Sequence, residues 1–143
     1  MLRHMVTIEY LHVCDYAFSA EGGKPCIIGI FDAIRAGAFP ATHPMMAIAM
    51  RLRGSAHELL QLKVELARPS RDVLATMQGE VTMGSDGSAF MQVNMAGVTF
   101  PEAGRYVIKV TCAGQALTSH SLQVQKIQVP PQPGPQSGSP KLH

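Results

Sequence analysis

Histidine and cysteine side chains that lie near one another in the sequence are the first candidates for chemistry in this chain. His12 and Cys14 are two residues apart, so in a strand both side chains point to one face, about 7 Å apart. With Cys26 and His43 they could form a nitrogen and sulfur ligand set of the kind that zinc prefers. However, the closely spaced cysteine pair of a structural zinc site is missing, and free cysteine is among the most buried residue types. We therefore interpret these residues as core positions and expect no metal and no cofactor.

Two further sites could supply a nucleophile, and both fit a structural role better. Cys112 continues an apolar face, whereas a reactive thiolate needs an exposed and cationic setting. Ser119, His120 and Ser121 are adjacent, but the chain has no G-x-S-x-G motif and no H-x-H or H-x-D pair. A G-x-x-x-x-G-K-[ST] phosphate loop is also missing. The sequence therefore predicts a protein that is not an enzyme, with no catalytic residue.

Alternation of apolar and polar residues dominates the chain between residues 6 and 124. This period, interrupted by Gly, Pro, Asn and Asp, is typical of short antiparallel strands. Turns are predicted at Glu21–Lys24 and Ser85–Ser88, and bulges at Gly79 and Gly97. The residues predicted to share one face of the first strand are Val6, Ile8, Tyr10, His12 and Cys14. The sequence thus predicts an all-β, antiparallel two-sheet β-sandwich of about eight strands, with a small barrel as the alternative.

Three segments in the first half of the chain are apolar on both faces of the strands they would form. They are residues 11–13, Cys26–Phe31 and Met45–Met50. Exposed apolar patches beyond a few hundred Å² are unusual on monomers. We therefore expect a cover over these strands. Either a second copy of the chain supplies it, most simply in a two-fold dimer, or the segment between the second and third of these strands folds over them.

That segment, residues 33–46, is apolar-rich and carries a single charge, which predicts a long irregular loop. Long loops inside compact domains are usually functional or packed. In one interpretation Phe39 plugs an open end of the sandwich. In the other the loop is an interface, with Arg35, Phe39, His43 and Met45 among its contact residues.

A series of short motifs runs along the whole predicted domain. They are CDYA at 14–17, GGK at 22–24, GIFD at 29–32, FP at 39–40, HP at 43–44, RLRG at 51–54 and FPEAGRY at 100–106. This order resembles a family of small bacterial proteins of unknown function, over roughly Thr7 to Val124. The resemblance implies a β-sandwich and no particular activity. Cys26 stands where such relatives are expected to carry a small polar residue.

Composition narrows the range of partners. The chain has 143 residues, enough for one domain, and only 15% of them are charged, against roughly 25% in an average soluble protein. Net charge is +2 and aromatic residues are 6% with no Trp, so the basic excess and stacking aromatics of a nucleic-acid binder are missing. No apolar run reaches the roughly 20 residues that cross a bilayer. We expect neither nucleic acid nor membrane as a partner.

The ends of the chain and its cysteines bear on compartment and domain limits. Three cysteines without close pairing do not resemble a disulfide framework, and the N-terminus lacks the apolar core of a secretory signal. Both features predict a cytoplasmic protein. We expect the β-sandwich domain to span residues 1–129, and residues 130–143, rich in Pro, Gly and Ser, to form a disordered tail.

Low charge, nine methionines and strands that are apolar on both faces favour a binding role, because methionine is common at adaptable contact surfaces. We expect a non-enzymatic binding or assembly module that self-associates as a homo-oligomer or binds another protein. The alternative is a β-sandwich that binds a small ligand or a carbohydrate. The candidate binding residues, taken from the motifs and the segment above, are Asp15, Tyr16, Asp32, Arg35, Phe39, His43 and Met45.

Overall fold

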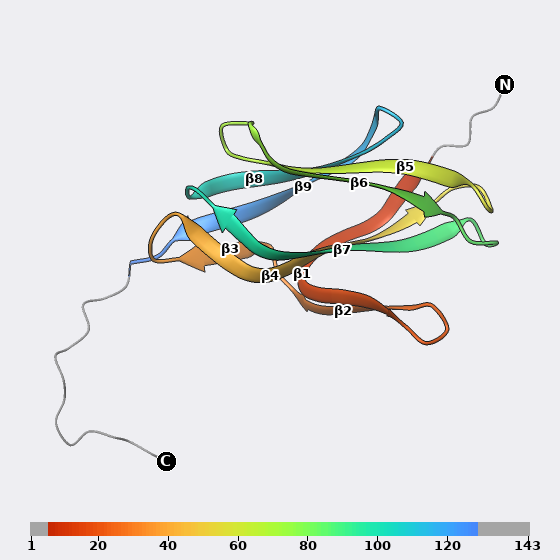
Figure 1. The fold of residues 1–143 in the computed structure, drawn as a ribbon, viewed down its shortest axis with the longest axis horizontal. Helices are drawn as coiled ribbons and strands as arrows, with labels where there is room; N and C mark the ends of the chain where they lie inside the picture. The colour runs from red at the N-terminus through yellow and green to blue at the C-terminus, as the bar shows by residue number, and fades with distance from the viewer. Residues whose placement is uncertain (1–5, 129–143) are drawn as a thin grey trace, which may run out of the picture.

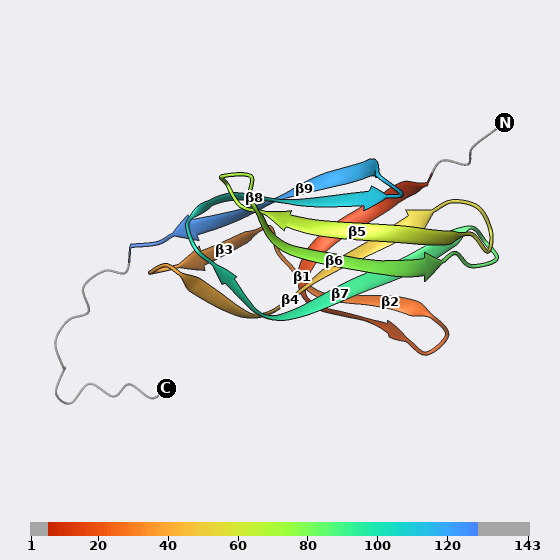
Figure 2. The ribbon, with the colours of Figure 1, turned by 45° about the horizontal axis from the view of Figure 1, so that its top comes forward.

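Two β-sheets packed face to face form the protein in a computed structural model that describes residues 6–128 (Figures 1 and 2). The first sheet, in the order β2-β1-β4-β7, contains β1 (Thr7–Ala20), β2 (Lys24–Ile30), β4 (Ala41–Arg53) and β7 (Ser88–Phe100). The second, in the order β3-β9-β8-β5-β6, contains β3 (Ala33–Ala36), β5 (Leu59–Ala67), β6 (Val73–Thr82), β8 (Gly104–Cys112) and β9 (Gln115–Lys126). The predicted all-β sandwich is confirmed, with nine strands instead of about eight.

Part of the predicted domain organisation concerns residues outside 6–128. The predicted tail at residues 130–143 and the first five residues fall outside residues 6–128. Within the described part of the chain, no helix has the length and apolarity needed to cross a membrane.

The core lies between the two sheets and follows the alternation of the strands. From the first sheet, β4 supplies Met46, Ile48, Met50 and Leu52, all 0% exposed. From the second sheet, the inward residues of β5 and β8 are Leu60, Leu62, Val64, Leu66, Tyr106, Ile108 and Val110. Because cross-strand neighbours share a face, the pairing of Val64 with Val110 keeps both rows inward.

The FPEAGRY motif forms the corner at which β7 passes into β8. The Tyr106 hydroxyl donates a hydrogen bond to the Glu102 carbonyl oxygen at 2.7 Å, the arrangement known as a tyrosine corner in β-sandwiches. The Phe100 ring packs edge-on against the Tyr106 ring with centroids 5.1 Å apart. Burial of this phenol raises the pKa of Tyr106.

The first strand changes face near its start, so the predicted single face of five residues is wrong. A bulge between Ile8 and Tyr10 shifts the register with β4, and a bulge adds one residue to one strand only. As a result Ile8 packs against the core, whereas His12 and Cys14 lie opposite Ala49 and Ala47 on the outer face.

Residues 33–46 are not the predicted loop. Ala33–Ala36 forms β3, which pairs in parallel with β9 at the edge of the second sheet, and β4 begins at Ala41. The chain changes sheet just before β3, where the Gln123 amide donates to the Asp32 carbonyl oxygen at 3.0 Å. Ile34 is 7% exposed and anchors this short strand in the core.

The two glycines predicted as bulges behave differently. Gly79 pairs directly with Leu62 in an unbroken register, so the prediction of a bulge there is wrong. At Gly97, with φ of 65°, β7 changes the side that faces the core, from Met95 to Val98. The predicted change of face is confirmed, but it occurs without a shift in the register between β4 and β7.

Candidate functional site

The first hairpin extends beyond the sheet from which it starts. β1 pairs with β4 from Thr7 to Cys14 and with β2 from Cys14 to Ala20. Its second half therefore leaves β4 and continues with β2 as a hairpin, residues 15–30, which we call the arm. The arm lies beside the first sheet on the side away from the second sheet, as the red and orange strands at the bottom of Figure 1 show.

Two hydrogen bonds from a side-chain amide and a buried cluster of small residues attach the arm to the sheet. The Asn94 side chain of β7 donates to the Ala17 carbonyl oxygen at 3.1 Å and accepts from the Ala17 amide at 3.4 Å. This pair imitates the backbone pairing of a strand, since an amide side chain is both donor and acceptor. Beneath it, Cys14, Ala17, Ala47 and Ala49 form a second core cluster, each 0% exposed. Small side chains at these positions let the two backbones approach closely.

A glycine with a positive φ lies beside Asp15 at the base of the arm. Gly29 has φ of 69°, a conformation that side chains rarely adopt. The Asp15 carboxylate lies directly over it, in the place that a Cβ atom would occupy. Cys14 is buried between the arm and the sheet, and this burial raises the pKa of its thiol. The cysteine therefore stays in the unreactive thiol form.

The side of the arm that points away from the sheet is apolar. Its residues, which we call the arm face, are Tyr16, Phe18, Cys26 and Ile28, arranged as two cross-strand pairs. The rings of Tyr16 and Phe18 lie 5.8 Å apart. Tyr16 is 42% exposed and Ile28 52%. These side chains can bury apolar area against a partner, and the Tyr16 hydroxyl and the Cys26 thiol are the polar groups among them.

Two more exposed apolar side chains lie where the arm leaves the sheet. Ile30 is 59% exposed and Met45 48%. Ile30 pairs with Cys14, and Cys14 pairs with Ala47, two residues along β4 from Met45. The other exposed large apolar residues, Leu59, Val73 and Ile127, belong to β5, β6 and the segment after β9. Exposed apolar surface therefore gathers on the arm and at its base.

The segments predicted to be apolar on both faces are covered partly by the chain itself. Val13 and Ile48 face the main core, and Ala47 and Ala49 face the arm. The cover comes from the arm and not from residues 33–46, so that part of the prediction is wrong. The outward side of Cys26–Phe31 remains uncovered, because Ile28 and Ile30 point to solvent.

The structure separates the seven predicted binding residues. Asp15, Tyr16 and Met45 lie on the arm or near its base. Phe39 is half-buried against the main core, and the His43 ring lies 5.5 Å from that of Phe31. The remaining two are elsewhere: Asp32 is at the crossing between the sheets, and Arg35 is exposed at the edge of the second sheet. Sequence reasoning missed Phe18 and Ile28, although their alternation with Ala17 and Ile27 carries the signal.

A small cavity of about 200 Å³ opens at the crossing between the sheets. His12, Asp32 and His120 are among the residues that line it. The Nε2 atom of His120 is buried without a hydrogen-bond partner, and burial, followed by the neighbouring His12, lowers the pKa of His120. Within residues 6–128 no three His, Cys, Asp or Glu side chains are grouped to hold a metal ion. The three cysteines are all unpaired.

These features define the class of the protein as a two-sheet β-sandwich with a projecting hairpin. The C-terminal domain of Wzt has a similar fold, with a TM-score of 0.53 and 9% identity over 86% of this chain and 75% of that one. The Pseudomonas fluorescens alkylpurine DNA glycosylase AlkC, solved with DNA containing an abasic site analogue, gives a TM-score of 0.52 and 14% identity over 84% of this chain. This chain spans about 30% of the glycosylase's length.

Residues 9–125 match the model of a family of unknown function, DUF6941, and the chain belongs to that family. No curated protein matches it in sequence. The expected membership of a family without a known function is thereby confirmed, while the two solved structures show a shared fold alone.

Proposed function

We propose that the protein is a non-enzymatic assembly module that self-associates through the arm face. The observation that carries the proposal is the gathering of exposed apolar side chains on the arm and at its base, with Ile28 at 52% and Ile30 at 59% exposed. Because about half of each side chain is still exposed, covering the remainder stabilises a contact by roughly 1 kcal/mol per side chain. Contiguous exposed apolar side chains of this kind mark an interaction site.

The charge pattern favours an apolar partner. The arm face carries no charged residue, and the nearby Asp15 carboxylate is turned onto Gly29. Glu21 and Lys24 stand at the tip of the arm, away from its centre. This arrangement is the common anatomy of an interface, with an apolar centre and a polar rim.

A second copy of the chain is the partner that fits best. A two-fold axis brings the same patch of each subunit together, so an uncharged apolar face is complementary to itself. Addition of a strand at the edge of β2 is a poorer solution, because Pro25 has no amide hydrogen to donate and Gly29 distorts the edge. We therefore propose a contact between faces. Three unpaired cysteines fit a reducing compartment such as the cytoplasm.

Two half-buried cysteines provide a matched test. Cys26 belongs to the arm face, whereas Cys112 lies at the far rim of the core in β8. If two arm faces associate, alkylation of Cys26 by a thiol reagent slows as protein concentration rises through the micromolar range, and that of Cys112 does not. Peptide mass spectrometry of the alkylated protein measures both rates. Equal rates at all concentrations for Cys26 would contradict self-association through the arm.

A further inference from the structure

A basic hollow lies on the outer face of the second sheet, on the opposite side of the molecule from the arm. It measures about 510 Å³ and is lined by the turn after β5, by the outward residues of β8 and by Ser119 of β9. No Asp or Glu is among its lining residues. Its size falls within the range of small-molecule sites, roughly 300–1,000 Å³.

The alternation of β8 directs cations into this hollow. Tyr106, Ile108 and Val110 are buried in the core, so Arg105, Val107 and Lys109 point to the outer face. Lys109 pairs across the strands with Ser119. The sheet therefore offers two cations, a hydroxyl group and an apolar floor at Val107.

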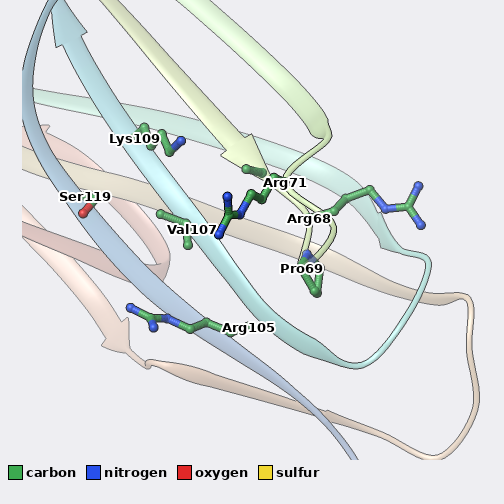
Figure 3. Close-up of a pocket in the computed structure, with 8 residues that line it drawn as sticks. Arg68, Pro69, Arg71, Arg105, Val107, Lys109 and Ser119 are labelled. Atoms are coloured by element: carbon green, nitrogen blue, oxygen red, sulfur yellow. The ribbon is translucent and has the colours of Figure 1, made fainter.

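A tight turn brings a third cation over the same floor. The Arg71 amide donates to the Arg68 carbonyl oxygen at 2.8 Å, and Arg71 has φ of 77°. This conformation is uncommon for a bulky residue and tends to occur at functional sites. It turns the Arg71 side chain back over β8 towards Val107 (Figure 3).

The turn at residues 68–72 packs against the first residue of β8, Gly104. Pro69 packs against Gly104, where an added Cβ atom would come within 2.6 Å of the proline ring. The Arg68 amide also donates to the Asp72 carbonyl oxygen at 2.7 Å. These contacts fix the backbone of the turn over the sheet, so the position of Arg71 relative to β8 is built into the fold.

Among the cations of the hollow only Arg68 forms a salt bridge within residues 6–128, although Glu65 lies across the strands from Lys109. Arg68 is neutralised by Glu102 at 3.1 Å and points away from the hollow. Arg71, Arg105 and Lys109 form no salt bridge within residues 6–128. The Arg105 Nε atom donates to the Ser121 hydroxyl at 2.8 Å, which orients the guanidinium and leaves its terminal nitrogens free to donate.

We propose that this hollow binds the phosphate group of a small phosphorylated molecule. Two guanidinium groups can each donate two parallel hydrogen bonds to a phosphate, and an ammonium adds a point charge. The Val107 side chain provides an apolar contact for the remainder of the ligand. The site is independent of the arm, because it uses the other sheet and none of the arm residues.

Titration of the ¹⁵N-labelled full-length chain with ribose 5-phosphate, followed by NMR, tests the proposal. Saturable shifts are expected for the amides of residues 105–109 and 119. Unphosphorylated ribose should produce none, and inorganic phosphate should compete for the same amides. Lys109→Gln and Arg71→Gln should each weaken binding about tenfold, equal to 1.4 kcal/mol. Both side chains are exposed, and the dispersion of the spectrum reports whether each variant is folded.

Lys24→Gln, at the tip of the arm, is the matched control and should leave the dissociation constant within twofold. Two results would overturn the proposal. The first is the absence of saturable shifts, or an equal loss of affinity in Lys24→Gln. Either outcome would mean that the hollow is not a specific phosphate-binding site. The other is tighter binding of oligothymidylate than of ribose 5-phosphate at the same amides, which would make the hollow part of an extended surface for nucleic acid.

Discussion

Adjacent residues of a strand point to opposite faces, and the Ser119-His120-Ser121 triplet shows the consequence. Lys109 and Val107, which pair with Ser119 and Ser121, lie on the outer face, whereas Ile108, which pairs with His120, lies in the core. The imidazole is thus separated from both neighbouring hydroxyl groups by the sheet. Residues that are adjacent in the sequence are thus placed on opposite sides of the sheet.

The lowered pKa of His120 predicts a dependence of stability on pH. Because burial disfavours the imidazolium in the folded state, the unfolded chain binds more protons than the folded one below about pH 6.5. Stability therefore falls as the pH drops through and below this value. Thermal unfolding between pH 7.5 and 5 measures the effect. In His120→Phe, which cannot titrate, the fall in melting temperature should be smaller; an identical fall would assign the dependence to other groups.

At the scale of elements, the arm is the feature on which the proposed function depends. Its attachment rests on the two hydrogen bonds between Asn94 and Ala17 and on the buried cluster below them. The small residues at Ala47 and Ala49 keep the arm close to β4. The arm therefore presents its outward residues at a fixed angle, which a specific contact requires.

Asn94→Ala should loosen the arm. It removes both hydrogen bonds and leaves the backbone of Ala17 without a protein partner, which costs about 1–2 kcal/mol of stability. Gln92→Ala is the control, because Gln92 is an amide two residues earlier on the same face of β7, opposite Ala49. It should change stability by no more than about 0.5 kcal/mol. Urea unfolding measures both, and equal effects would mean that Asn94 does not hold the arm.

Regularly alternating strands could be predicted from the sequence, whereas β-bulges and a short strand paired with a remote segment could not. Apolar and polar residues alternate regularly in Leu60–Leu66 and Tyr106–Cys112, because β5 and β8 each have one buried face. The bulge near Ile8 has no local signature, so the face of the following residues was assigned wrongly. β3 has four residues and its partner β9 is remote in the sequence, so no local period reveals it.

The candidate site was harder to predict than the fold. Of the predicted binding residues, Tyr16 and Met45 are exposed, whereas Phe39 packs against the main core and His43 against Phe31. The arm face arises because a hairpin folds back on its own sheet, and this depends on a contact between Ala17 and Asn94, distant in sequence. The hollow likewise joins β8 to a turn that only the fold brings near.

At the scale of the whole molecule, the two sheets present different chemistry to solvent. Within residues 6–128, four of the seven exposed large apolar side chains lie on the first sheet and its arm, whereas the second sheet carries the cations of the hollow together with exposed Leu59 and Val73. A two-fold contact through the arm would leave both hollows open on the far sides of a dimer. Assembly and ligand binding are therefore expected to be separable by mutation, since they share no residue.

Sedimentation equilibrium at micromolar concentration tests the central claim of self-association most directly. The wild-type chain should show about twice its monomer mass of 15.4 kDa. Ile28→Glu should reduce the mass to that of the monomer, because a carboxylate would be buried at the contact. Val73→Glu is the matched control: Val73 is 51% exposed and Ile28 52%, and Val73 lies on the second sheet, so this variant should remain dimeric. A wild-type monomer, or equal dissociation by both substitutions, would contradict the account.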